Sequence, residues 1–213
     1  MKTAPPSVAA HALLTELRRH TVHTPPPPPA PDWTLPALAG GLVELSGSEN
    51  SAGLSWAFQL VLDAQERGEP VAWLMTGADG FFPPDAADTG VDLDALVVVR
   101  LAEARRLARA ADVLLRSGAF GLVVIDLAEA PVPIPVQTRL AGVAQKHASV
   151  VLFLTRKDDE SPSLGSLVGV RAQARRERLG EAAWSCTLHV LKDKRRGPGW
   201  RREERMRGPA GLR

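Results

Sequence analysis

The sequence predicts an α/β domain, a mostly parallel sheet covered by helices on both faces. Apolar runs of strand length alternate with helical segments, and these runs are apolar throughout instead of switching between apolar and polar residues. That pattern is typical of strands buried on both faces of a sheet. We expect strands at 42–45, 71–75, 95–99, 121–125, 149–154 and 186–191, and helices at 52–67, 101–117 and 136–147.

The predicted core domain runs over 41–191 and is long enough to bury one hydrophobic core. Before it we expect an N-terminal helix within 1–24 and a proline-rich linker over 25–40, since a run of prolines forms an extended spacer. After it, 192–213 forms a basic C-terminal tail, and both ends are expected to be flexible. The helix either docks on a partner or folds back on its own domain; its apolar stripe is formed by Leu13, Leu14 and Leu17.

Composition excludes several classes of protein. The net charge is +2, and the single cysteine, Cys186, rules out a disulfide framework and is expected to be a buried thiol. The histidines show no metal-ligand spacing, so no metal is expected. No apolar run reaches the length of about 18 residues that spans a membrane. We therefore expect a cytoplasmic protein without membrane contact.

The glycine-rich stretch after the first predicted strand has the layout of a phosphate-binding loop, in which backbone N–H groups and a helix N-terminus hold an anion. A working loop reads G-x-x-x-x-G-K-[ST]. With one extra loop residue, Gly53 and Ser55 take the glycine and hydroxyl positions, but Leu54 replaces the lysine. No lysine lies between Thr3 and Gln145. The degenerate loop comprises Gly47, Ser48, Glu49, Asn50, Ser51, Ala52, Gly53, Leu54 and Ser55.

Asp126 ends the apolar run GLVVIDL. An acid at the carboxyl end of a buried strand occupies the place of a Walker B aspartate, which holds magnesium. The alternative is an aspartate that caps the following turn. Without a lysine in the loop, we regard Asp126 as vestigial and expect no cofactor.

Several segments together resemble the ATPase core of RecA recombinases: GLVELSGSENSAGLS, VAWLMTGADGFFPPDAADTGVDLDALVV, LLRSGAFGLVVIDLAEAPVP, VLFLTR and LHVLKDKRRGP. They are nearly colinear with RecA over most of 41–191. In this resemblance the catalytic glutamate falls on Ala78, beside Asp79, and the γ-phosphate-sensing glutamine falls on Arg156. The DNA-binding loops are reduced to the acidic KDDESPSLG, which repels a phosphate backbone. Losing several of these groups costs powers of ten in phosphoryl transfer, so we expect no enzyme activity.

Among RecA-like proteins, the layout is most similar to the ImuA group, accessory proteins of damage-induced mutagenesis. The resemblance implies a non-catalytic, nucleoid-associated adaptor in translesion synthesis that binds RecA and an ImuB-type inactive Y-family polymerase. It also implies an error-prone replicative polymerase as a further partner, with weak or no direct DNA binding. The alternatives are a nucleotide-binding regulator, a weak ATPase, or a SulA-like division inhibitor.

The basic segment after Leu191 is the predicted partner-binding region. The resemblance matches Lys192 and Lys194 to the lysines that contact ATP on a neighbouring subunit, so the chain is expected to cap or inhibit a RecA filament. A solvated basic tail is the alternative for these lysines. Basic residues around a tryptophan suit an acidic protein partner or single-stranded DNA, and the further candidates are Arg195, Arg196, Trp200, Arg201 and Arg202. A predicted helix face upstream carries Arg171, Arg175, Arg176 and Arg178, which we expect to be solvated.

Overall fold

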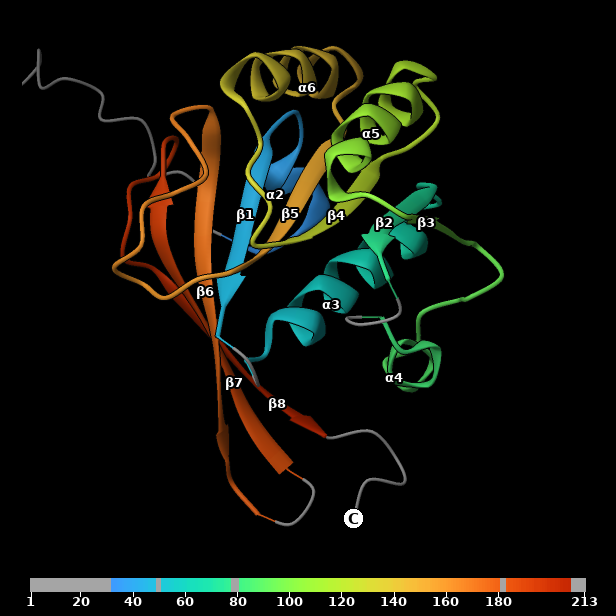
Figure 1. Ribbon diagram of the computed structural model, residues 1–213. Helices are drawn as coiled ribbons and strands as arrows, with labels where there is room; N and C mark the ends of the chain where they lie inside the picture. The colour runs from blue at the N-terminus through green and yellow to red at the C-terminus, as the bar shows by residue number, and fades with distance from the viewer. Residues whose placement is uncertain (1–31, 49–50, 78–80, 181–182, 208–213) are drawn as a thin grey trace, which may run out of the picture. The chain divides into compact units, whose positions relative to one another are not determined.

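A computed structural model describes residues 32–48, 51–77, 81–180 and 183–207 (Figure 1). These residues form an eight-stranded sheet in the order β3-β2-β4-β5-β1-β6-β7-β8, with helices packed against it. The α/β fold class is therefore confirmed. The elements are α2 (Leu35–Leu38), β1 (Leu42–Gly47), α3 (Gly53–Glu66), β2 (Val71–Thr76), α4 (Pro83–Asp88), β3 (Leu96–Leu101), the 3₁₀ turn η1 (Ala104–Arg106), α5 (Leu107–Arg116), β4 (Leu122–Ala128), α6 (Ile134–His147), β5 (Val150–Arg156), β6 (Val168–Arg178), β7 (Ala183–Asp193) and β8 (Arg201–Arg207).

The sheet has a parallel part and an antiparallel part. Strands β3 to β6 in the sheet order are parallel, whereas β7 and β8 run antiparallel to their neighbours. The central strands β1, β2, β4 and β5 are almost entirely buried, because their valines, leucines and isoleucine meet side chains on both faces.

Two hydrophobic clusters lie on opposite faces of the sheet. On one face α5 and α6 pack through Leu107, Leu115 and Leu140, and on the other α3 packs through Trp56 and Leu60. Figure 1 shows α5 and α6 on one side of the central strands and α3 on the other. The expected two-sided cover is therefore present over the parallel strands.

Residues 32–40, which we placed in a flexible linker, are part of the folded domain. Trp33 is buried, and its indole N–H donates to the carbonyl of Trp56 at 3.1 Å. The N–H of Leu35 donates to the carboxylate of Asp63 at 2.7 Å, which fixes the start of α2 against α3. The linker prediction is wrong for this stretch because one tryptophan and two leucines give it enough apolar surface to dock.

The segment with Arg171, Arg175, Arg176 and Arg178 is strand β6, not the helix that we expected. Its apolar side chains alternate with polar ones, so that Val170, Ala172 and Ala174 face the core. Alternation of this kind is the period of a strand. The small alanines weakened the apolar signal, and the arginines suggested a helix face.

Residues 192–207 are also folded, so the expected flexible tail is wrong for this part. Strand β7 continues to Asp193, and β8 pairs with it along its length. Trp200 packs against the core, and its indole N–H donates to Asp193 at 3.2 Å. The predicted N-terminal helix, with Leu13, Leu14 and Leu17, lies outside the described residues. In the residues that the structure describes, no helix is both long and apolar enough to cross a membrane.

Candidate functional site: a hollow at the carboxyl ends of the parallel strands

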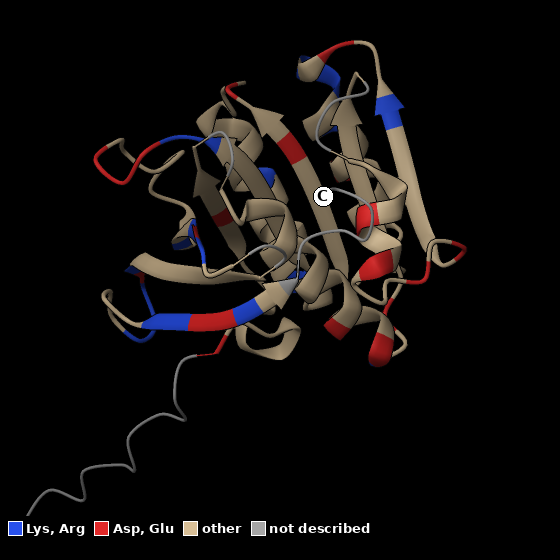
Figure 2. Ribbon diagram, turned by 90° about the horizontal axis from the view of Figure 1, so that it is seen from below, with Lys and Arg blue, Asp and Glu red and all other residues tan. Residues whose placement is uncertain are grey.

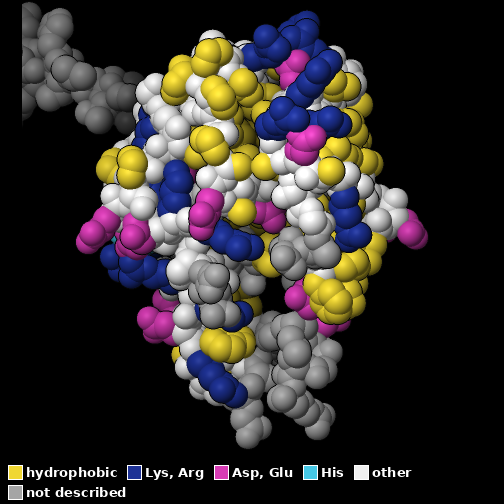
Figure 3. All heavy atoms as spheres, in the orientation of Figure 1, with side chains coloured by type: hydrophobic (Ala, Val, Ile, Leu, Met, Phe, Trp, Pro, Cys, Tyr) yellow, Lys and Arg dark blue, Asp and Glu magenta, His cyan; other side chains and the backbone are white. Residues whose placement is uncertain are grey.

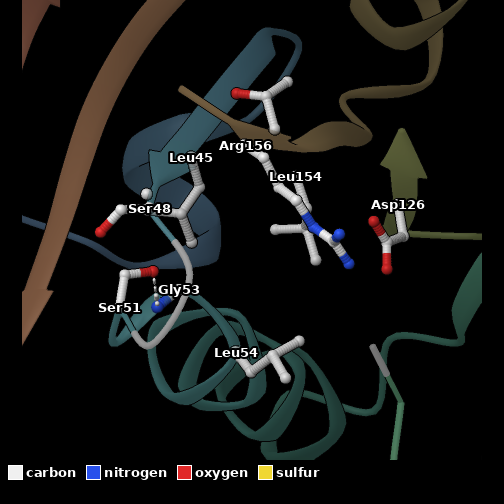
Figure 4. Close-up of a pocket in the computed structure, with 10 residues that line it drawn as sticks. Leu45, Ser48, Ser51, Gly53, Leu54, Asp126, Leu154 and Arg156 are labelled. Atoms are coloured by element: carbon white, nitrogen blue, oxygen red, sulfur yellow. Dashed lines mark hydrogen bonds between the residues drawn. The ribbon is translucent and has the colours of Figure 1, made fainter. Parts of the chain in front are cut away.

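A hollow of about 380 Å³ opens where β1, β4 and β5 end and α3 begins (Figure 4). Ligands of open parallel sheets bind at this edge. The structure brings the predicted phosphate loop and Asp126 to the same cavity, although they lie far apart in sequence. The lining residues are Leu45, Gly47, Ser48, Ser51, Gly53, Leu54, Asp126, Leu154, Thr155 and Arg156. Of the other loop residues, Ala52 is buried and Ser55 does not line the hollow, while Glu49 and Asn50 lie outside the described residues.

The loop between β1 and α3 is closed on itself by Ser51. The N–H of Ser51 donates to the carbonyl of Ser48 at 3.1 Å. The Ser51 hydroxyl accepts the N–H of Gly53, the first residue of α3, at 3.2 Å (dashed in Figure 4). A Cβ on Gly47 would stand 2.6 Å from the Cβ of Ser51, so only glycine allows this approach. A helix N–H that could hold an anion is thus already bound within the protein.

Leucine side chains form the apolar part of the hollow. Leu54 lies in the first turn of α3, at the position where the loop motif has its lysine, and Figure 4 shows its side chain directed into the hollow. Leu45 and Leu154 line the hollow from β1 and β5. Hydrocarbon at these places offers a triphosphate no charge neutralisation.

Asp126 and Arg156 are the charged residues of the hollow. The Arg156 guanidinium extends from the end of β5 toward Asp126 (Figure 4). Burial raises the pKa of Asp126, opposed by a hydrogen bond from the N–H of Ala128 at 3.2 Å and by the charge of Arg156. Within the described part of the chain, no ion pair joins Asp126 to a cation. The carboxylate therefore lies in an environment that favours its neutral form.

A second polar centre, which the sequence analysis missed, lies on β1, which β5 separates from β4 in the sheet. Glu44 is completely buried, and its carboxylate accepts hydrogen bonds from the ammonium of Lys157 at 3.0 Å and the hydroxyl of Thr155 at 3.2 Å. It also accepts from the hydroxyl of Ser163 at 2.9 Å and the N–H of Leu164 at 2.8 Å. The sequence does contain a signal for this centre. Glu44 lies inside an apolar strand, and a buried charge requires partners.

The loop over 157–167 is held by cations as well as by Glu44. The Arg171 guanidinium donates to the carbonyls of Asp158, at 2.6 Å, and Ser161. The Lys192 ammonium donates to the carbonyl of Gly165 at 3.1 Å, and that of Lys194 to the carbonyl of Ser166. Burial lowers the pKa of Lys192. The acidic loop is thus tied down on the domain.

The remaining predicted partner-binding residues also make contacts within the domain. The guanidinium groups of Arg195 and Arg196 donate to the carbonyls of Ala39 and Ala37, each at 3.2 Å. Arg202 donates to Asp32 at 2.6 Å and lies 5.7 Å from the ring of Trp56. Arg201 is exposed. These residues therefore do not form one free patch.

No family model matches the chain. The chain does match curated RecA proteins. The chain is 40% identical over 95 residues to the RecA protein of Nocardioides sp., and 35% identical over 136 residues to that of Bifidobacterium breve. These matches cover 44% and 63% of this chain, but 27% and 32% of those proteins. The RecA protein of Chlorobaculum tepidum is 29% identical over 141 residues, covering 57% of this chain and 40% of that protein.

The fold is RecA-like. The mostly parallel α/β sheet is consistent with these matches, so the resemblance seen in the sequence is supported at the level of the core. The chain spans about a third of the length of the RecA proteins that it matches.

Proposed function

We propose that this chain is a non-hydrolysing RecA-like adaptor that acts by protein contacts in damage-induced mutagenesis. Its partners are RecA and an ImuB-type inactive Y-family polymerase, with an error-prone replicative polymerase as a further member of the complex, close to the nucleoid. The ImuA-like assignment is supported by the sequence resemblance and by a RecA-like core in which the hollow beside the glycine loop is poorly suited to bind a triphosphate.

The observation that carries the proposal is the closed glycine loop. A triphosphate needs free helix N–H groups and a cation over its β- and γ-oxygens. Here the N–H of Gly53 is bound to Ser51, and Leu54 stands in the place of the lysine. The residues of the hollow therefore do not fit ATP with magnesium, and we derive no catalytic step from it.

Isothermal titration calorimetry with ATP and magnesium tests this directly. We expect no binding heat at ligand concentrations that saturate a RecA protein measured in parallel as the positive control. A dissociation constant in the micromolar range would overturn the adaptor proposal in favour of a nucleotide-binding regulator or weak ATPase.

Pull-down assays test the partners separately from the nucleotide site. Immobilised full-length chain should retain RecA and the ImuB-type polymerase equally well with and without ATP. Retention of neither protein would contradict the adaptor role. A protein of the division machinery retained instead would support the SulA-like alternative.

The proposed capping of RecA filaments by Lys192 and Lys194 requires that both ammonium groups leave the carbonyls of Gly165 and Ser166. If they act on a neighbouring subunit, Lys192→Ala with Lys194→Ala abolishes filament shortening by this chain. The control variant is Lys146→Ala, an exposed lysine on α6. Undiminished shortening by the double variant would show that the lysines serve only to hold the loop.

A further inference from the structure

Two opposite charges in the hollow at the carboxyl ends of the parallel strands lack charged partners. The Asp126 carboxylate accepts one hydrogen bond, from the N–H of Ala128. The described residues provide no ion pair for Asp126, and neither a hydrogen bond nor an ion pair for Arg156. Figure 4 shows the Arg156 guanidinium directed across the hollow toward Asp126, with no hydrogen bond drawn between them. The two side chains therefore frame a space with a negative group on one side and a positive group on the other.

Hydrocarbon lines the space between these charges. Leu45, Leu54 and Leu154 border it from β1, α3 and β5, and Leu45 and Leu154 are buried. The hollow has a volume of about 380 Å³. Small-molecule sites have volumes of this order and combine apolar walls with a few polar groups that fix the orientation of the ligand. A ligand that suits these walls carries an apolar body as well as polar ends.

The distribution of charge indicates which ligands the hollow excludes. Arg156 is the one basic residue among the described residues that line it. Figure 3 shows Lys and Arg side chains gathered over α5, which packs on the opposite face of the sheet from α3. Figure 2 shows the parallel strands tan over most of their length, so few charges lie along the strands that frame the hollow. A ligand with several negative charges would meet one guanidinium and a carboxylate that repels it. A polyanion is therefore disfavoured.

We propose that the hollow binds a free α-amino acid with an apolar side chain. Its ammonium would donate to the Asp126 carboxylate, and its own carboxylate would accept two parallel N–H bonds from the Arg156 guanidinium. Its side chain would lie among the three leucines and remove their surface from water. Each charge of the hollow then gains a partner of opposite sign.

A ligand with a single charge fits less well. An amine, or a lysine side chain of a partner protein, would neutralise Asp126 and leave Arg156 facing two cations. A fatty acid would neutralise Arg156 and add a second carboxylate beside Asp126. Because a partly buried charge needs a partner, only a ligand with one charge of each sign satisfies both residues.

This inference rests on the proposed function at one point, the exclusion of ATP from the hollow. It adds a small-molecule ligand to an adaptor that is otherwise defined by its protein contacts. The two proposals fail separately, because heat from ATP with magnesium would contradict the proposed function, whereas the results with amino acids bear on this inference alone.

Isothermal titration calorimetry of the full chain with L-leucine, L-methionine and L-phenylalanine tests the ligand class. We expect at least one of the three to bind, and glycine, which has no apolar side chain, to bind at least about tenfold more weakly. Dissociation constants weaker than about 10 mM for all three amino acids would overturn the inference. Equal binding of glycine would overturn the role of the leucines.

Analogues of leucine test each charge on the unmodified chain. 4-Methylpentanoic acid lacks the ammonium, and leucinol has a hydroxyl in place of the carboxylate. Each should bind at least about tenfold more weakly than L-leucine, because one residue of the hollow then lacks its partner. Leucinol that binds as tightly as L-leucine would reassign the hollow to amines, and 4-methylpentanoic acid that does so would reassign it to carboxylic acids; either result overturns the proposal.

Two variants locate the site. Asp126→Asn should weaken binding of L-leucine at least about tenfold without weakening that of 4-methylpentanoic acid, and Arg156→Gln should do the same for L-leucine and leucinol. The matched control is Arg139→Gln, an exposed arginine on α6 outside the hollow, which should bind as the unmodified chain does. Unchanged affinity for L-leucine in both variants would place binding elsewhere. Should a variant fail to fold, the analogue series on the unmodified chain still decides the question.

Discussion

Two carboxylates near the carboxyl ends of the parallel strands have opposite surroundings. Glu44 on β1 is fully buried and accepts hydrogen bonds from Thr155, Lys157, Ser163 and Leu164. Asp126 on β4 accepts one backbone N–H, and burial raises its pKa. The difference teaches that Asp126, the acid at the place of a Walker B aspartate, has few hydrogen-bond partners, whereas Glu44, which the sequence analysis did not single out, organises the neighbouring loop.

The largest expected loss of stability comes from replacing Glu44. Glu44→Ala removes the counter-charge of Lys157, whose ammonium keeps only the carbonyl of Pro162, and leaves the N–H of Leu164 without this acceptor. It should lower the free energy of unfolding by about 3–5 kcal/mol. Urea unfolding followed by tryptophan fluorescence measures it. Glu44→Gln is the control, because it keeps the shape and an acceptor oxygen and should lose less. If the alanine variant lost less than about 1 kcal/mol, the loop would be held mainly by Arg171 and the lysines.

Asp126→Asn should change the free energy of unfolding in the opposite direction, so that the variant is more stable. The folded-state pKa of Asp126 is raised, so the native chain loses stability as pH rises from the ordinary aspartate pKa through the raised value. Asparagine avoids this loss and still accepts the N–H of Ala128. We expect a gain on the order of 1 kcal/mol at neutral pH that disappears in acid. A gain that persists at low pH would point to a cause other than ionisation.

Leu54→Lys should make the surroundings of Asp126 more like those of Glu44, because it supplies a cation to the hollow. A lysine stem can follow the path of the leucine, so its ammonium should reach the vicinity of Asp126 and favour the charged carboxylate. We expect a stability change within roughly 0.5 kcal/mol and a smaller pH dependence near the aspartate range. Unfolding curves over a series of pH values measure this. An unchanged pH dependence would mean that the ammonium points to solvent.

Much of the fold could be predicted from the sequence because the central strands are buried on both faces. The predicted strands at 71–75 and 121–125 agree with β2 and β4 within a few residues. Strands β6 and β8 were missed because both are rich in arginine. In β6, which is parallel to β1 and antiparallel to β7, small apolar residues on the core face alternate with polar ones and give a weak signal. Strand β8 reads RREERMR and carries almost no apolar signal.

The candidate site could be located from the sequence but not described. The glycine loop and Asp126 follow strands whose ends meet at one edge, so their proximity was foreseeable. The Ser51 hydrogen bond to Gly53 was not, because it depends on the loop conformation. The bonds of Lys192 and Lys194 to the loop over 157–167 join segments far apart in sequence, which residue spacing does not reveal.

The close approach of Ser51 to Gly47 bears on how this lineage could change. A lysine at position 54 would still leave the N–H of Gly53 bound to the Ser51 hydroxyl, where a phosphate would need that N–H free. A phosphate site here would therefore require substitutions at both positions 51 and 54, and neither substitution alone would create it.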